Sequence, residues 1–174
     1  HGPKGVGFLY VNSNINITPL IHGGSQEKNM RGGTEYVYGI VGLSTAMDIA
    51  FSKMSLHHAH ILKLKEHMIK SLKNSIPKIS FNGLSSDISK SLYTVLSVSI
   101  PKFKNSDLLL LNLDLFGIAC SGGSACSSGS SKLSHVISEI NKKNDNVVVR
   151  FSFCKYNTIE EIDYVVEKLR YLID

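Results

Sequence analysis

The sequence predicts a mixed α/β chain in which helices alternate with short strands. Two features carry this prediction. Apolar residues recur at helical spacing in two long stretches between residues 35 and 74, and short runs of β-branched and aromatic residues follow from residue 79 onward. The 174 residues are 43% hydrophobic and 19% charged, which is enough to build the core of about one domain. The composition therefore excludes an intrinsically disordered chain.

The N-terminal part of the chain combines one apolar run with one glycine-rich stretch. Residues 6–11 are apolar, β-branched or aromatic with one glycine and predict a strand, yet the next 30 residues offer no comparable strand to pair with it. Residues 22–34 are rich in glycine and polar side chains and predict a loop. The chain also opens without a methionine. We therefore expect it to be the C-terminal part of a longer protein whose upstream strands complete this sheet.

Two helices are expected after the loop, over residues 35–50 and 56–74, because apolar side chains return there every three or four positions. Pro77 prevents the second helix from continuing. Two strands are expected next, at residues 79–81 and 93–100, and the second alternates its side chains with the period of a strand.

Beyond residue 100 the pattern changes repeatedly between helix and strand. The expected elements are a helix over residues 106–115, a brief strand at 117–120, a serine and glycine loop at 121–131, a helix at 132–141, a strand at 147–153 and a final helix from 158. Ser106 is expected to be the N-cap of the first of these helices. Thr158 and Glu161 have the spacing of a capping box at the start of the last.

Charge, hydropathy and cysteine content exclude several functional classes. The net charge is +5, but 16 of the 19 basic residues are lysines scattered along the chain, so a nucleic-acid partner is not expected. No apolar run has the length of about 18 to 20 residues that a membrane span needs. Three cysteines without a C-x-x-C pair support neither a disulfide framework nor a zinc knuckle. A reducing compartment, the cytoplasm, is therefore expected.

Histidines gather at the start of the second expected helix. His57 and His60 would share one helix face, which is the spacing of two metal ligands. A zinc site requires three or four ligands, and no further ordered ligand emerges from the sequence. We therefore expect a solvated helix start and no metal site.

Cys126 is the strongest candidate for a nucleophile. Serine and glycine surround it, and such a segment suits a thiol that must move to reach its partner, whereas the alternative is a small buried cysteine in a turn. Cys120 and Cys154 lie in strand-like runs and fit a buried structural role better. Residues 121–131 are expected to be the most mobile internal segment, and residues 93–100 the most rigid.

Two further positions are candidates for binding anionic groups. Arg150 interrupts the apolar run of residues 147–153, and its guanidinium is suited to holding a carboxylate by two hydrogen bonds; the alternative is an arginine on an open strand face. Arg31, Thr34 and backbone N–H groups of the first loop are suited to a phosphate. That loop lacks the Gly-Lys-Ser/Thr ending of a P-loop, so a nucleoside triphosphate is disfavoured.

Four segments, taken together, resemble those of one enzyme family. They are GPKGVGFLY at residues 2–10, HGG…MRGGT at 22–34, GSACS at 123–127, and VRFS at 149–152 followed by NTIEEID at 157–163. In order and approximate spacing they resemble the NifS/IscS-type cysteine desulfurases, which are class V, fold type I enzymes dependent on pyridoxal phosphate. The resemblance implies that residues 1–50 are the end of a large cofactor-binding domain. Residues 51–174 would be a small α/β domain with a short, mostly antiparallel sheet covered by helices.

The resemblance also implies roles for the candidate residues. Cys126 matches the cysteine whose thiolate takes the sulfur of L-cysteine, which leaves alanine and an enzyme persulfide for iron–sulfur cluster or thio-cofactor assembly. Arg150 matches the arginine that holds the substrate carboxylate. Thr34 matches the threonine that reaches the cofactor phosphate of the other subunit in a homodimer. A sulfur-acceptor or scaffold protein is the implied macromolecular partner.

One departure from the family limits what this chain does alone. The lysine that forms the Schiff base is absent, since the family places it just before the position of His1, and Lys4 matches a different family position. We therefore expect this chain alone to bind no pyridoxal phosphate and to be inactive. Two alternatives stay open: a dimerisation or sulfur-carrier module without turnover, and a related class V activity such as selenocysteine cleavage.

Overall fold

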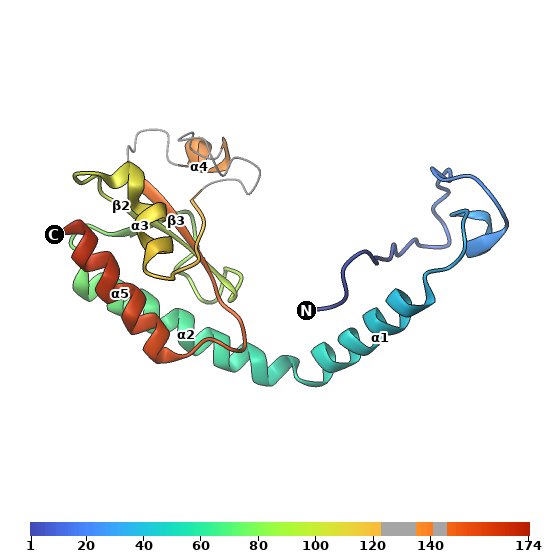
Figure 1. Cartoon of the computed structure of the whole chain (residues 1–174), viewed down its shortest axis with the longest axis horizontal. Coiled ribbons are helices and arrows are strands. Elements are labelled where there is room, and N and C mark those ends of the chain that lie inside the picture. The colour runs from blue at the N-terminus through green and yellow to red at the C-terminus, as the bar shows by residue number, and fades with distance from the viewer. Residues whose placement is uncertain (123–134, 141–145) are drawn as a thin grey trace. The chain divides into compact units, whose positions relative to one another are not determined.

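The computed structural model describes residues 1–122, 135–140 and 146–174 (Figure 1). The chain divides into two compact units, His1–Met54 and Ser55–Asp174. The expected boundary was at residue 50, and the assignment of the first unit to a larger cofactor-binding domain stays a prediction. No helix in the described part of the chain combines the length and the apolar character needed to cross a membrane.

The first unit contains a short 3-10 helix, η1 (Gln26–Asn29), and one long helix, α1 (Val37–Ser52). The expected first helix and the expected loop before it are therefore confirmed. The strand expected at residues 6–11 is wrong for this chain, since these residues form no strand. The physical reason is that a strand requires a hydrogen-bonded neighbour, and this unit provides none.

The second unit holds most of the regular structure. Its elements are α2 (Met54–Ser75, which begins on the last residue of the first unit), β1 (Ser80–Phe81), β2 (Val95–Ile100), η2 (Ser106–Leu108), α3 (Leu109–Leu115), α4 (His135–Ile140), β3 (Val147–Ser152) and α5 (Ile159–Ile173). This order agrees with the expected one except that no strand forms at residues 117–120. The ends of the helix expected at 132–141 lie outside the described residues.

Two of the expected local features are wrong. Ser106 is not an N-cap: it lies inside η2, is buried, and Asn105 precedes it in the left-handed conformation. Residues 117–120 form no strand, because only Ser121 pairs with β3, through an isolated bridge. The capping box is confirmed, since the Thr158 side chain accepts a hydrogen bond from the Glu161 N–H at the start of α5.

The three strands form one antiparallel sheet in the order β1-β2-β3. The register of β2 and β3 places Leu96 opposite Phe151 and Ser97 opposite Arg150. Because successive side chains point to opposite faces of a strand, one face of the sheet is apolar, and the other carries the mainly polar set Ser97, Ser99, Arg150 and Ser152 together with Val95 and Val148. This short antiparallel sheet with helices confirms the predicted fold class.

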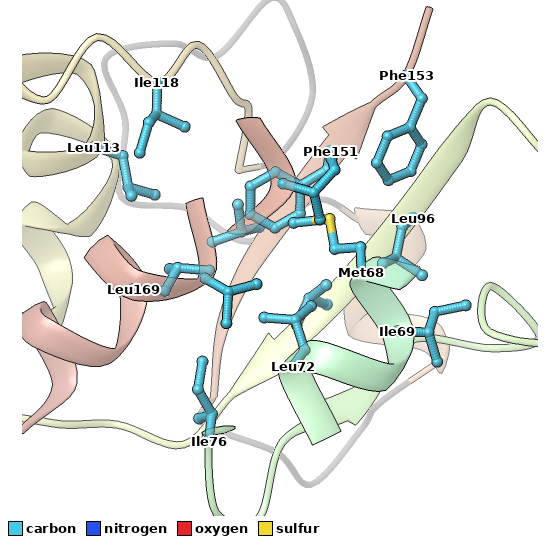
Figure 2. Packing of buried hydrophobic residues seen from close by; sticks show 14 of the residues in the cluster. Met68, Ile69, Leu72, Ile76, Leu96, Leu113, Ile118, Phe151, Phe153 and Leu169 are labelled. Atoms are coloured by element: carbon cyan, nitrogen blue, oxygen red, sulfur yellow. The ribbon is translucent and has the colours of Figure 1, made fainter. Parts of the chain in front are cut away.

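The apolar face of the sheet is covered by α2 and α5, which run side by side in the same direction (Figure 1). Figure 2 shows Met68 and Leu72 of α2 beside Leu96 and Phe151 of the sheet, with Leu169 of α5 close by. These side chains are members of one buried cluster that also includes Leu109 and Leu113 of α3, Ile118 and Phe153. The core of the second unit therefore fixes β3, which carries Arg150, from one side.

Candidate functional site

Arg150 lies within β3, and its backbone N–H and carbonyl form hydrogen bonds on the side of the strand away from β2. It lies opposite Ser97 of β2, and on its other edge its N–H donates to the Ser121 carbonyl oxygen at 2.6 Å while its own carbonyl accepts from the Ser121 N–H at 3.2 Å. Its neighbours Val149 and Phe151 belong to the core, so its half-buried side chain lies on the opposite face of the sheet. The sheet therefore fixes the backbone from which the guanidinium extends.

The face of the sheet that carries Arg150 is lined by small polar groups. The Asn82 side-chain amide donates to the Ser97 hydroxyl at 2.9 Å, and the Asn146 amide donates to the Ser99 hydroxyl at 3.1 Å. Among the described residues no carboxylate forms an ion pair with Arg150. A guanidinium can hold a ligand carboxylate by two hydrogen bonds, and this role of Arg150 stays a prediction.

Cys126 lies outside the described residues, but the beginning of its loop is described. Ser121 is bridged to Arg150, and a Cβ added at Gly122 would lie 2.8 Å from the Val148 carbonyl oxygen and 2.6 Å from the Leu110 side chain, so only glycine fits there. Five residues of chain reach at most about 18 Å, which bounds the separation of Cys126 from Ser121. The loop that carries Cys126, the candidate nucleophile, therefore begins beside Arg150, the candidate carboxylate-binding residue. The predicted mobility of this loop falls almost entirely outside the described residues.

The other two cysteines are free thiols in structural positions. Burial, together with the negative charge of Asp114, raises the pKa of the Cys120 thiol to about 11. Since the thiolate is the nucleophilic form, Cys120 is poorly suited to attack at neutral pH. Cys154 is half-buried in the turn after β3, where its N–H donates to the Asn157 side-chain oxygen at 2.8 Å. Both observations support Cys126 as the candidate nucleophile.

Thr34 is exposed at the end of the glycine-rich loop of the first unit, three residues before α1 begins. The loop is closed upon itself: the Gly32 N–H donates to the Ile21 carbonyl at 3.0 Å, and the Gly33 N–H donates to the Gln26 side chain at 3.2 Å. The Gly32 and Gly33 N–H groups are therefore satisfied within the loop, and the expectation that loop amides bind a phosphate stays a prediction for the others. The Thr34 hydroxyl and the exposed Arg31 remain as phosphate-binding candidates.

The histidines of α2 take structural roles. The described residues contain no group of three or more potential metal ligands. His60 lies 3.0 Å from the Asn157 carbonyl oxygen, and His67 lies 2.6 Å from the Asp163 carboxylate, so both link α2 to the start of α5. The start of α2 is exposed, as expected, since residues 54–60 are all exposed except the half-buried His57. The contacts with α5 were not predicted, because the sequence alone does not show which helix packs alongside.

Lys65 is a structurally important residue that sequence reasoning missed. Its side chain is completely buried, and its amine donates to the Ser91 hydroxyl at 2.7 Å and to the Leu92 carbonyl at 2.9 Å. Burial lowers its pKa from the ordinary lysine value. A signal was present, because position 65 falls on the apolar stripe of α2 next to Leu64 and Met68.

Asn157 is the second residue that sequence reasoning missed as a contact centre. Its side-chain oxygen accepts from the Cys154 N–H, its amide donates to Glu161 at 2.9 Å, and its carbonyl oxygen lies within hydrogen-bond distance of His60. The turn after β3 is therefore fastened to both helices. An asparagine directly before a Thr-x-x-Glu capping box is a signal for such a turn.

Comparisons with known proteins agree with this arrangement. The aminotransferase class-V family matches residues 1–165. The chain is 38% identical over 176 residues to the cysteine desulfurase IscS of Dictyoglomus turgidum, covering 100% of this chain and 44% of that protein. It is 38% identical over 175 residues to the cysteine desulfurase IscS of Clostridium botulinum strain Hall, covering 99% of this chain and 44% of that protein.

Solved structures show the same relationship. A NifS-like protein superposes with a TM-score of 0.78 at 36% identity, over 99% of this chain and 43% of that protein. A NifS-like protein from Rickettsia africae gives a TM-score of 0.72 at 28% identity, over 91% of this chain and 41% of its own length. The chain therefore spans less than half the length of the relatives that it matches.

Proposed function

This chain belongs to the aminotransferase class V family, and we propose that it is the C-terminal part of a cysteine desulfurase, which takes sulfur from L-cysteine and leaves alanine and a persulfide on Cys126. The observation that carries the proposal is the bridge between Arg150 and Ser121. It joins the strand of a carboxylate-binding side chain to the start of a cysteine loop, in a chain 38% identical to proteins named cysteine desulfurase IscS. The persulfide sulfur would serve iron–sulfur cluster or thio-cofactor assembly.

The two residues of the second unit act on different parts of the substrate. Arg150 holds the α-carboxylate of L-cysteine through two parallel hydrogen bonds, which fixes the orientation of the substrate. The Cys126 thiolate attacks the substrate sulfur and forms the new S–S bond as the carbon–sulfur bond breaks. The electron pair of the broken bond stays with the substrate carbon, which takes up a proton to become the methyl group of alanine. The raised pKa of Cys120 keeps a competing thiol protonated.

Pyridoxal phosphate is the cofactor that family membership implies, and it supplies an electron sink when bound. The exposed Thr34 hydroxyl and the neighbouring Arg31 fit a phosphate, since both are donors that an anion prefers. No lysine of this chain matches the family's Schiff-base position, so the full-length protein must supply it. We propose that Thr34 serves the cofactor of the other subunit in a homodimer, and that the enzyme is cytoplasmic.

The proposal is tested in the full-length enzyme by Cys126→Ala. This variant is expected to form no persulfide from L-cysteine while keeping the absorbance of the bound cofactor, because the thiol acts after the substrate has bound. Cys120→Ala and Cys154→Ala are matched controls that should retain activity. Loss of persulfide in a folded, cofactor-loaded control instead of in Cys126→Ala would overturn the assignment of the nucleophile.

The role of Arg150 is tested by Arg150→Lys, which keeps the charge but loses the planar pair of donors. We expect KM for L-cysteine to rise by roughly tenfold or more, as lost substrate binding predicts. Arg170→Lys on the exposed side of α5 is the matched control and should leave KM unchanged. Equal KM values in both variants would show that Arg150 is only a surface residue of the strand.

A further inference from the structure

A groove of about 520 Å³ opens beside the end of β3, and the site described above does not use it. Its volume lies in the range of ligand-binding pockets. Its floor is apolar and is formed by Met68, Ile118, Phe151, Phe153, Ile162 and Val165. Four of these residues, Met68, Ile118, Phe151 and Phe153, are labelled in Figure 2. Since the floor belongs to the core side of the sheet, the groove lies on the face opposite the Arg150 side chain.

The groove exists because two extended segments separate after their single bridge. Residues 117–119 line one wall, and Phe151, Ser152 and Phe153 line the other, while Ser121 and Arg150 join the two walls at one end. The N–H and carbonyl of Arg150 both bond to Ser121, so by strand alternation those of Ser152 point to the same side. Within the described part of the chain, no backbone hydrogen bond satisfies Ser152 there. The groove therefore presents an open strand edge.

The rim of the groove is acidic although the chain as a whole is basic. Glu160 and Glu161 line it, and among the described residues its lining contains no lysine, arginine or histidine, whereas the net charge of the chain is +5. Glu160 is exposed, and the hydrogen bond from its own backbone N–H, followed by that of the Thr158 hydroxyl, lowers its pKa. Glu161 is engaged in the cap of α5, which leaves Glu160 as the carboxylate available to a partner.

From these observations we propose that the groove binds an extended peptide segment of a partner protein, which adds to the free edge at Ser152 as a short strand. Such a segment places alternate apolar side chains on the floor and at least one lysine or arginine against Glu160. Main-chain hydrogen bonds supply affinity in this mode of recognition, and the alternating side chains supply specificity. The proposal does not rest on desulfurase activity, because binding and turnover are measured separately.

The experiment uses the full-length, cofactor-loaded enzyme and the fluorescein-labelled peptide Lys-Val-Lys-Val-Lys-Val, with Glu-Val-Glu-Val-Glu-Val as the probe of opposite charge. Fluorescence anisotropy is expected to show saturable binding of the lysine peptide and weaker binding of the glutamate peptide. Amide hydrogen exchange at Ser152 is expected to slow when the lysine peptide is bound, since its N–H gains a partner.

Glu160→Lys and Glu167→Lys provide a matched pair, because both change one exposed carboxylate of α5 to an amine and only Glu160 lines the groove. Glu160→Lys is expected to lower the affinity for the lysine peptide by about fivefold at low salt and to raise the affinity for the glutamate peptide. Glu167→Lys is expected to change neither affinity. Activity with L-cysteine should be the same in both. If the lysine variant folds poorly, Glu160→Gln is used instead, because it removes the negative charge without adding a positive one.

Three results would overturn the proposal. Equal binding of the two peptides, or equal effects of the two lysine variants, would show that the groove does not select the partner. A Ser152 amide that is already protected in the free full-length enzyme would show that another part of the same protein fills the groove. Absence of peptide binding in an active enzyme would reject the docking site while leaving the proposed desulfurase function intact.

Discussion

The two units of this chain carry similar apolar side chains but bury them to very different extents. In the first unit Leu20, Tyr38 and Tyr10 are 93%, 86% and 80% exposed, and only two glycines, Gly32 and Gly39, are buried. Among the described residues of the second unit, a cluster of 18 hydrophobic residues is buried between the helices and the sheet. The comparison shows that α1 can form as the sequence predicts although no other residues of its unit fully bury its apolar side chains. The apolar surface of the first unit therefore predicts that it folds stably only against other protein.

The sharpest way to break this comparison is to separate the units. Residues 55–174 expressed alone are expected to unfold cooperatively, because their core is internal to the unit. Residues 1–54 alone are expected to be largely unfolded, since an isolated helix of 16 residues is marginally stable in water. Circular dichroism and thermal unfolding of both fragments test this prediction. A cooperative transition in residues 1–54 would contradict it.

A smaller effect is expected from truncating one side chain in each unit. In the 174-residue chain, Leu72→Ala should lower the free energy of unfolding by about 2–5 kcal/mol, because the fully buried side chain would leave a cavity. Val41→Ala on α1 should change it by no more than about 0.5 kcal/mol, because Val41 is 59% exposed. Urea unfolding measures both.

The same Val41 variant sharpens the comparison when it is placed in the full-length protein. If other parts of that protein cover α1, Val41→Ala should become clearly destabilising there. A negligible effect in both contexts would mean that this side of α1 faces solvent throughout.

The success of the sequence predictions does not follow the division into units, because α1 was predicted in the first unit and the strand expected at 117–120 failed in the second. Helix α2, the strands β2 and β3, and α5 with its capping box were predicted, because their periodicity and caps are local signals that agree with the final core. The strand expected at residues 6–11 did not form, because the described part of this chain offers it no neighbouring strand, as the lack of a comparable apolar run in the next 30 residues had indicated. The strand expected at 117–120 failed because these residues separate from β3, and only the next residue, Ser121, pairs with it.

The candidate site was predicted only in part for a related reason. Arg150 was identified because a charged residue within an apolar strand is visible in the sequence, and the structure places it beside the start of the Cys126 loop. Lys65 and Asn157 were not identified, because their partners Ser91 and Cys154 are selected by tertiary packing. No local pattern encodes contacts of that kind.

The two units also differ in how their helices begin: α5 has a capping box, whereas Tyr36, the N-cap residue of α1, makes no side-chain hydrogen bond. Removing the cap of α5 is expected to have a still smaller effect on stability. Thr158→Ala removes the hydroxyl that accepts from the Glu161 N–H at 3.2 Å and should reduce stability by about 1 kcal/mol. Thr158→Ser keeps the hydroxyl and is the control, expected to lose much less. Equal losses in both variants would assign the effect to the methyl group and not to the cap.

A further effect expected in the second unit is a pH dependence of stability that originates at Cys120. Burial and the charge of Asp114 raise the pKa of this thiol from 9.0 to about 11 in the folded chain. Between these values the unfolded chain loses the proton and the folded chain retains it, so the unfolded state becomes relatively more stable as pH rises. The contribution of Cys120 to stability is therefore fully present below about pH 9 and is lost as pH rises toward 11. Urea unfolding of the 174-residue chain between pH 8 and pH 11 measures the loss, at values chosen to span both pKa values.

Two cysteine variants isolate this contribution, because every other titrating group, including Lys65, is common to them. Cys120→Ala should show a shallower decline of stability with pH than the parent chain, since the buried thiol no longer titrates. Cys154→Ala should follow the parent chain. If Cys120→Ala kept the full decline, the thiol would have an ordinary pKa in the folded chain, and the argument that burial keeps Cys120 from competing with Cys126 would fail with it.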